Sequence, residues 1–218
     1  MEIVWYGQSC FRIRGRGCSL VTDPYPPELG ATLPKLTTSM VAISRDDANH
    51  SYVRALRGKP YVVAGPGEYE VAGIFVQGVP MKRSGGTKDS PGVRITSYVI
   101  ELEGVTVCHL GQLDSMPTQE QIELFNDVDI LLVPVGGHGV LTGTRAAEVV
   151  NLIEPGIVIP MQYRVKGLQG PGKTQYDTTN RFFKELAVEP QEAIESLTLT
   201  RSQVPDSTRV VTLEPTLA

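Results

Sequence analysis

Residues 40–50 read Met40-Val41-Ala42-Ile43-Ser44-Arg45-Asp46-Asp47-Ala48-Asn49-His50, an apolar run that ends abruptly in a dense polar cluster. An uncharged run of this kind, bounded by polar residues, predicts a buried strand. In α/β folds, the residues that follow the carboxyl end of a strand commonly hold ligands and catalytic groups. We therefore expect the functional site to lie at the end of this strand.

Short strand-like segments separated by glycine or proline dominate the first half of the chain. Besides the strand at residues 40–44, they span residues 3–6, 10–14, 19–22, 61–64, 69–71, 74–79, 93–102 and 105–110. From residue 129 the pattern changes to an apolar strand at 130–135, a one-sided apolar helix at 144–153 and a second apolar strand at 157–161. That order is typical of a βαβ unit with parallel strands.

Signals for shorter elements accompany this framework. Thr118 and Gln121 have the spacing of a capping box, which predicts a short helix ending near residue 125. Asp177 is the expected N-cap of a last helix, followed by strands near residues 197–200 and 209–213. Many strands first and helix–strand pairs later predict one α/β domain, residues 1–218, built as a two-sheet sandwich.

Composition limits the classes of function. With 218 residues and 41% hydrophobic content, the chain can bury a sizeable core. A net charge of −4 gives no basic surface for nucleic acid, so we expect no nucleic-acid partner. No apolar run approaches the roughly 20 residues of a membrane span, and we expect a soluble, cytoplasmic protein without membrane contact. The three cysteines lack C-x-x-C spacing and are expected to be core residues rather than disulfide or zinc ligands.

Six short motifs follow one another in a fixed order along the chain. They are Trp5-Tyr6-Gly7-Gln8-Ser9-Cys10-Phe11, Thr22-Asp23-Pro24, Gly65-Pro66-Gly67-Glu68-Tyr69-Glu70-Val71, His109-Leu110-Gly111, Val133-Pro134-Val135-Gly136-Gly137 and Ile159-Pro160-Met161. In this order they resemble motifs of the metallo-β-lactamase superfamily, in the branch that includes ascorbate-6-phosphate lactonase-like and other predicted zinc-dependent hydrolases. The similarity extends from residue 2 to about 214 and implies a four-layer αββα sandwich.

The same resemblance implies where a binuclear metal site would lie, and there the residues differ from the family pattern. Of the seven ligand positions, only one keeps its residue type, a histidine. Arginine only donates hydrogen bonds and stays charged, and amides are poor zinc ligands. We therefore expect no metal, no other cofactor and no metal-activated hydroxide. The positions hold Arg45, Asp47, Asn49, His50, Arg83, Gln112 and Gln162, and Gln8 replaces a histidine of the opening motif.

Two interpretations of this altered site remain open. In one, Arg45 and Arg83 neutralise Asp46 and Asp47 and the site is inert. In the other, the two arginines bind a small anion such as a phosphate or carboxylate, together with Gln112, Gln162 and His50. Either way, the sequence favours a hydrolase-like pseudoenzyme with a ligand-binding or structural role, and the resemblance makes a homo-oligomer an expectation. The alternative is an active hydrolase that uses unusual metal ligands or no metal.

Three further patterns are interpreted as structural. Residues Gly167 to Thr174 match the spacing of a phosphate-binding P-loop, but the next helical pattern begins only after Asp177, so we expect a flexible loop. Cys108 and His109 are adjacent on a strand, so their side chains point to opposite faces and cannot form a catalytic dyad. His138, in a glycine-rich turn, is expected to be an exposed loop residue rather than part of a cleft.

Overall fold

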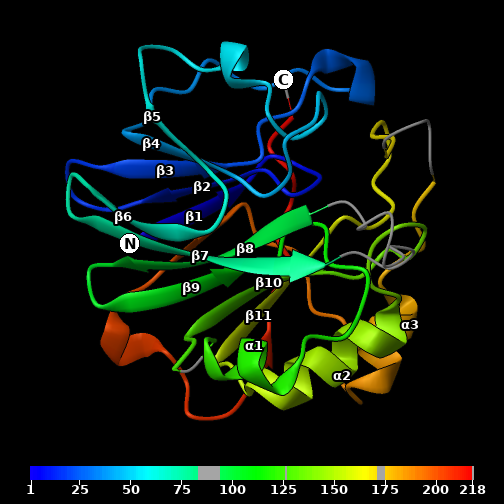
Figure 1. Ribbon diagram of the computed structural model, residues 1–218. Coiled ribbons are helices and arrows are strands. Elements are labelled where there is room, and N and C mark those ends of the chain that lie inside the picture. Colours follow the sequence, from blue (N-terminus) through cyan, green and yellow to red (C-terminus); the bar gives the residue numbers. More distant parts are fainter. Residues whose placement is uncertain (83–93, 126, 171–174, 218) are drawn as a thin grey trace, which may run out of the picture.

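The computed structural model describes residues 1–82, 94–125, 127–170 and 175–217, and the chain forms two β-sheets packed face to face (Figure 1). The first sheet has six strands in the order β12-β1-β2-β3-β4-β5. The second has seven strands in the order β13-β11-β10-β9-β8-β7-β6. The predicted two-sheet sandwich is therefore confirmed.

Most strands agree closely with the predicted segments. Strand β7 is longer than predicted, and the last strand is shorter. The first sheet contains β1 (Glu2–Trp5), β2 (Phe11–Arg14), β3 (Ser19–Thr22), β4 (Met40–Ile43), β5 (Tyr61–Ala64) and β12 (Ser196–Thr198). The second contains β6 (Gly67–Val71), β7 (Ile74–Lys82), β8 (Arg94–Leu102), β9 (Val105–His109), β10 (Ile130–Pro134), β11 (Ile157–Met161) and β13 (Arg209–Val210).

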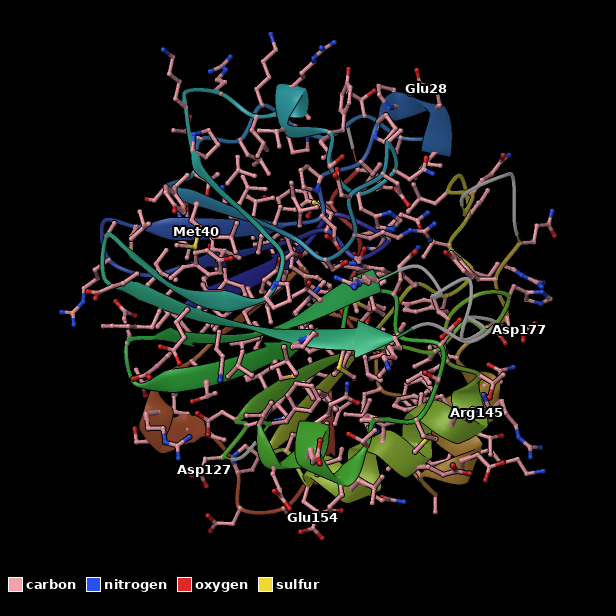
Figure 2. All side chains as sticks on the ribbon, viewed as in Figure 1. Glu28, Met40, Asp127, Arg145, Glu154 and Asp177 are labelled. Atoms are coloured by element: carbon pink, nitrogen blue, oxygen red, sulfur yellow. The ribbon has the colours of Figure 1, made fainter. Side chains whose placement is uncertain are left out.

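The main core lies between the two sheets. There Trp5, Phe11 and Met40 from the first sheet pack in one apolar cluster with Tyr98 and Ile159 from the second. All five side chains are fully buried. Figure 2 shows Met40 on the first sheet, beside the space between the sheets. This cluster removes a large apolar area from water and so fixes how the two sheets are stacked.

The two outer faces are covered differently. The helices α1 (Gln119–Glu123), α2 (Gly143–Ile153) and α3 (Asn180–Glu185) cover the second sheet (Figure 1, bottom). Over the first sheet, the described residues form loops and two short 3-10 turns, Pro27–Leu29 and Val53–Ala55, instead of α-helices. The connector that begins this layer contains four prolines between residues 24 and 34. Proline lacks the amide N–H that a helix interior needs, which accounts for the irregular layer.

Helix starts follow the predicted signals in part. The capping box of Thr118 and Gln121 begins α1, as predicted. Strands β10 and β11 are parallel and flank α2, so the βαβ unit is confirmed. The prediction that Asp177 caps the last helix is wrong, because α3 begins at Asn180 with Thr179 as N-cap. The Asp177 backbone is instead hydrogen-bonded to neighbouring loops.

The polar loops lie at one end of the sandwich. Strand β4 begins at Met40, on the left in Figure 2, and runs toward the end of the molecule where Asp177 is labelled. Strand β3 runs parallel to β4, so both deliver their carboxyl ends to this edge. In the second sheet, β9, β10 and β11 are likewise parallel to one another.

None of the described helices is long enough and apolar enough to cross a membrane.

Candidate functional site

Arg45 connects the polar loop after β4 to the loop after β9. Its Nε lies 2.6 Å from Oδ2 of Asp47, and its Nη1 donates to Oε1 of Gln112 at 2.7 Å. Gln112 is buried, and the Arg45 side chain is 22% exposed. Three of the predicted site residues are thus in direct contact, although 67 positions separate Arg45 from Gln112.

The second carboxylate oxygen of Asp47 is also bound. His50 Nδ1 lies 2.7 Å from Asp47 Oδ1, and the backbone N–H of Asn49 donates to the same oxygen at 2.9 Å. Burial alone would raise the pKa of Asp47, but the His50 hydrogen bond, the nearby charges of His50 and Arg45 and the Asn49 N–H together lower that pKa. Asp47 is therefore ionised at neutral pH, and Arg45 balances its charge.

Asp23, which directly follows β3, holds the start of the polar loop through two hydrogen bonds from Ser44. Its side chain is fully buried. Oδ1 accepts the backbone N–H of Ser44, and Oδ2 accepts the Ser44 hydroxyl, both at 2.6 Å. The φ of Asp23 is 39°, a left-handed conformation that is uncommon outside glycine. The sequence places Asp23 in a motif without assigning it a role, and the parallel pairing of β3 and β4 is what brings it to Ser44.

His109, the last residue of β9, is fully buried beside Asp23. Its Nε2 lies 3.0 Å from the carbonyl oxygen of Ser9, so Nε2 carries the proton and donates it. The same atom lies 4.0 Å from Asp23 Oδ2. Burial lowers the pKa of His109 and outweighs the opposing effects of the Asp23 charge and the Ser9 carbonyl, so the ring is neutral at neutral pH. Cys108 packs on the opposite, helix-covered face, which confirms that the two side chains form no dyad.

Gln8 and Gln162 are neighbours near Ser9. Both have positive φ, 51° and 49°, and both are buried. The backbone N–H of Gln162 donates to the Gln8 carbonyl at 3.3 Å, and the Gln8 amide donates to the carbonyl of Gln169 at 2.8 Å. Within the described ranges, the Gln162 amide has no hydrogen-bond partner for its nitrogen or its oxygen. A chain of contacts through Ser9 and His109 links this pair to Asp23 and the polar loop.

Of the remaining candidate positions, some lie outside the described residues and the others do not join these contacts. Arg83 lies outside the described residues, as do residues 171–174 of the P-loop-like motif. No helix starts at the described part of that motif, since α3 begins at Asn180. The side chain of His138 is 56% exposed, with Nε2 3.5 Å from Oδ1 of Asp177. Asp46, a proposed partner of the arginines, is exposed.

The donors found among the described residues do not fit the binuclear metal site that the resemblance implies. In the part of the chain that the structure describes, no group of three or more His, Cys, Asp or Glu side chains could hold a metal ion. Asp47 and His50 are bonded to each other, and the cationic guanidinium of Arg45 lies between Asp47 and Gln112. A guanidinium cannot ligate a cation and repels one.

Known proteins share this architecture. A family model described as a beta-lactamase superfamily domain matches residues 2–162. A UPF0173 protein from Pyrococcus abyssi is 27% identical over 189 residues, which cover 77% of this chain and 85% of the relative. A UPF0173 metal-dependent hydrolase from the same organism is 28% identical over 147 residues, 66% of this chain and 65% of the relative.

A solved structure extends the similarity to nearly the whole chain. The Thermotoga maritima protein, described as a candidate zinc-dependent hydrolase of the metallo-β-lactamase superfamily, is 31% identical with a TM-score of 0.78, and 97% of each chain is covered. The chain belongs to the metallo-β-lactamase superfamily.

Proposed function

We propose that this protein is a metal-independent member of the superfamily, without hydrolase activity, that uses its fold to bind a ligand. The observation that carries the proposal is the guanidinium of Arg45, bonded to both Asp47 and Gln112. These residues stand where the family resemblance implies metal ligands. The proposal therefore sets this chain apart from its relatives named as metal-dependent hydrolases.

The energetics of metal binding support this proposal. A complete structural zinc site contributes roughly 10–16 kcal/mol, which requires several deprotonated ligands aimed at one point. Here Asp47 would have to release Arg45, and the freed positive charge would remain beside the metal. Without a metal there is no metal-activated hydroxide to act as nucleophile.

The hydrogen bonds also disfavour a metal-free hydrolase. Such an enzyme needs a base that accepts the proton of its nucleophile. The Ser44 hydroxyl donates to Asp23, whereas His109 donates from Nε2 to the Ser9 carbonyl. Among the hydrogen bonds of the described residues, no histidine accepts from a serine or cysteine side chain. The polar groups are thus arranged to hold the loops rather than to activate a nucleophile.

Metal content tests the proposal directly. We expect protein expressed with added zinc and manganese, and purified without chelator, to contain far less than one metal ion per chain by elemental analysis. EDTA should leave the melting temperature unchanged, because an ion that is not bound contributes no linkage free energy. Bis(p-nitrophenyl) phosphate and p-nitrophenyl esters should be hydrolysed only at the background rate. One or more metals per chain together with metal-dependent turnover would overturn the proposal.

Replacing Arg45 and Gln112 with metal-ligand residue types tests whether these two residues exclude the metal. The double variant Arg45→His, Gln112→Asp removes the guanidinium and adds two ligand types beside Asp47 and His50. We expect its zinc affinity, measured by calorimetry, to be at least about tenfold higher than that of the wild type. The matched control Arg181→His, Gln119→Asp makes the same exchanges on exposed helix residues and should not change zinc binding. Equal zinc affinity in both double variants would contradict the role given to Arg45.

A further inference from the structure

We propose that the cavity between Gln8 and Arg164 is the binding site for a small phosphate or carboxylate anion. The inference rests on the binding role proposed above and adds its position and ligand class. The cavity measures about 270 Å³ and lies beside the buried Gln8–Gln162 pair. It is separate from the Arg45 network, whose guanidinium already has a carboxylate partner.

A strap after β11, defined here as residues 163–170, forms one wall of the cavity. The Gln169 backbone N–H donates to the Leu29 carbonyl at 2.9 Å, and the Gln169 carbonyl accepts from the Gln8 amide. Leu168 packs against the apolar cluster on the outer face of the first sheet. The strap passes so close to Gly30 (φ 103°) that a Cβ there would clash with the carbonyl oxygen of Gly167. The wall is therefore held in position by the N-terminal half of the chain.

Arg164, the second residue of the strap, is held by the backbone of Tyr176 and Asp177. Nε of Arg164 donates to the Tyr176 carbonyl at 2.9 Å, and the Arg164 backbone N–H donates to the Asp177 carbonyl at 2.9 Å. These bonds orient the guanidinium and leave its two terminal nitrogens available, since no described carboxylate forms an ion pair with it. A fixed guanidinium is well suited to the paired oxygens of a phosphate or carboxylate.

The other lining groups are uncharged and can donate hydrogen bonds. Among the described residues, no acidic residue lines the cavity, whereas Gln8, Gln169, Gln175 and Tyr163 do. Burial raises the pKa of Tyr163 to about 12, so the phenol keeps its proton. The Tyr163 ring lies against Trp5 in a tilted arrangement, with ring centroids 5.1 Å apart. In the described part of the lining, a guanidinium accompanied by neutral donors and by no carboxylate favours an anion over a cation.

Gln162 is a neighbour of lining residues rather than a lining residue of the cavity itself. It directly precedes Tyr163 and Arg164 in the chain, and its amide is buried without a partner among the described residues. An unpaired buried amide costs free energy, so natural proteins usually satisfy such groups. Gln162 is hydrogen-bonded through its backbone to Gln8, which lines the cavity.

Inorganic phosphate and glycerol 3-phosphate are suitable probes. At constant ionic strength, we expect each to raise the melting temperature of the wild type by a few degrees at saturation. Arg164→Gln should weaken the affinity measured by calorimetry at least about tenfold. Gln175→Glu adds a carboxylate at an exposed lining position and should abolish the shift without disturbing the strap. Arg181→Gln, an exposed arginine on α3, is the matched control and should respond like the wild type.

The outcomes separate this inference from the proposed function. No shift in the wild type would overturn the anion site, even if the protein proves to be free of metal. A shift that persists in Arg164→Gln and in Gln175→Glu would place the anion elsewhere and also overturn it. A larger response to glycerol 3-phosphate than to inorganic phosphate would indicate an organic phosphate as ligand, and equal responses would indicate the free anion.

Discussion

Arg45 is the residue on which the polar loop after β4 depends, because its guanidinium contacts both Asp47 and Gln112. The two ionised side chains are 22% and 25% exposed, so their contact contributes less than that of a fully buried pair. We expect Arg45→Ala to lower the free energy of unfolding by about 1–2 kcal/mol, measured by urea denaturation. Arg181→Ala breaks an exposed ion pair with Glu185 and should cost at most about 0.5 kcal/mol. Equal losses in the two variants would contradict a special role for Arg45.

His109 predicts how stability depends on pH. Its folded pKa lies below the ordinary value of 6.5, so between the two values the unfolded chain binds a proton that the folded chain does not. This contribution to stability is complete above about pH 6.5 and is lost as the pH falls toward the folded pKa. His109→Gln keeps a donor for the Ser9 carbonyl but removes the titration. Its melting temperature should fall less than that of the wild type between about pH 7 and about pH 5.

The exposed His138 provides the comparison for that pH experiment. Because His138→Gln leaves the buried ring of His109 in place, its melting temperature should follow the wild-type pH profile. If instead the His109→Gln and wild-type profiles have the same slope, the neutral buried ring is not a source of the acid sensitivity. Asp47, whose pKa is lowered, affects stability only at lower pH, below the ordinary value of about 3.8–3.9.

Elements with a strong local pattern were predictable from the sequence. Strands β4 and β11 and helix α2 have regular apolar spacing, and each is found within one residue of its expected bounds. The last helix was predicted but its start was not, because Asp177 has the right side chain for an N-cap while its backbone is bonded to the loops at Gly136 and Arg164. Such tertiary hydrogen bonds leave no local signal in the sequence. Over the first sheet the fold resemblance implied helices, but the described residues form loops and short 3-10 turns there, and the prolines between residues 24 and 34 are a local signal for that difference.

The N-cap of helix α2 allows a test of how much a single capping hydrogen bond contributes to stability. The Thr142 hydroxyl accepts from the Arg145 backbone N–H at 3.4 Å and caps a helix that buries Ala146, Val149 and Val150. We expect Thr142→Ala to destabilise the protein by about 1 kcal/mol and Thr142→Ser to cost clearly less, as measured by urea denaturation. Since the hydrogen bond is long, a loss below about 0.3 kcal/mol in Thr142→Ala would show that this cap contributes little beyond the packing of α2.

At the scale of the whole molecule, the site depends on how the two sheets are stacked. The resemblance to the family grouped Arg45 with Gln112, and the structure places them in contact. No periodic pattern could reveal the contact of Ser9 with His109, because the two residues lie 100 positions apart and on different sheets. The same holds for the strap contact between Gln8 and Gln169. Long-range polar contacts of this kind follow from the packing of complete sheets and appear only in the folded molecule.

Tyr98 predicts how strongly the two sheets are coupled. From β8 in the second sheet, its buried hydroxyl donates to the Ile43 carbonyl at 2.7 Å and accepts the Gly65 N–H at 3.1 Å, at the ends of β4 and β5 in the first sheet. Tyr98→Phe keeps the ring in the core but leaves these groups without their partner. We expect a loss of about 1–3 kcal/mol in the free energy of unfolding. Tyr61→Phe, at a position 52% exposed, should change stability by less than about 0.5 kcal/mol.

Trp5 makes the same experiment a test of cooperativity, because it is the single tryptophan of the chain and is buried between the sheets. If the sandwich unfolds as one unit, Trp5 fluorescence and far-ultraviolet circular dichroism should give the same urea midpoint in the wild type and in Tyr98→Phe, with an unchanged m-value. A fluorescence transition at lower urea than the circular dichroism transition would mean that the sheets separate before they unfold. In that case the Tyr98 hydroxyl contributes to docking of the sheets rather than to a single cooperative core.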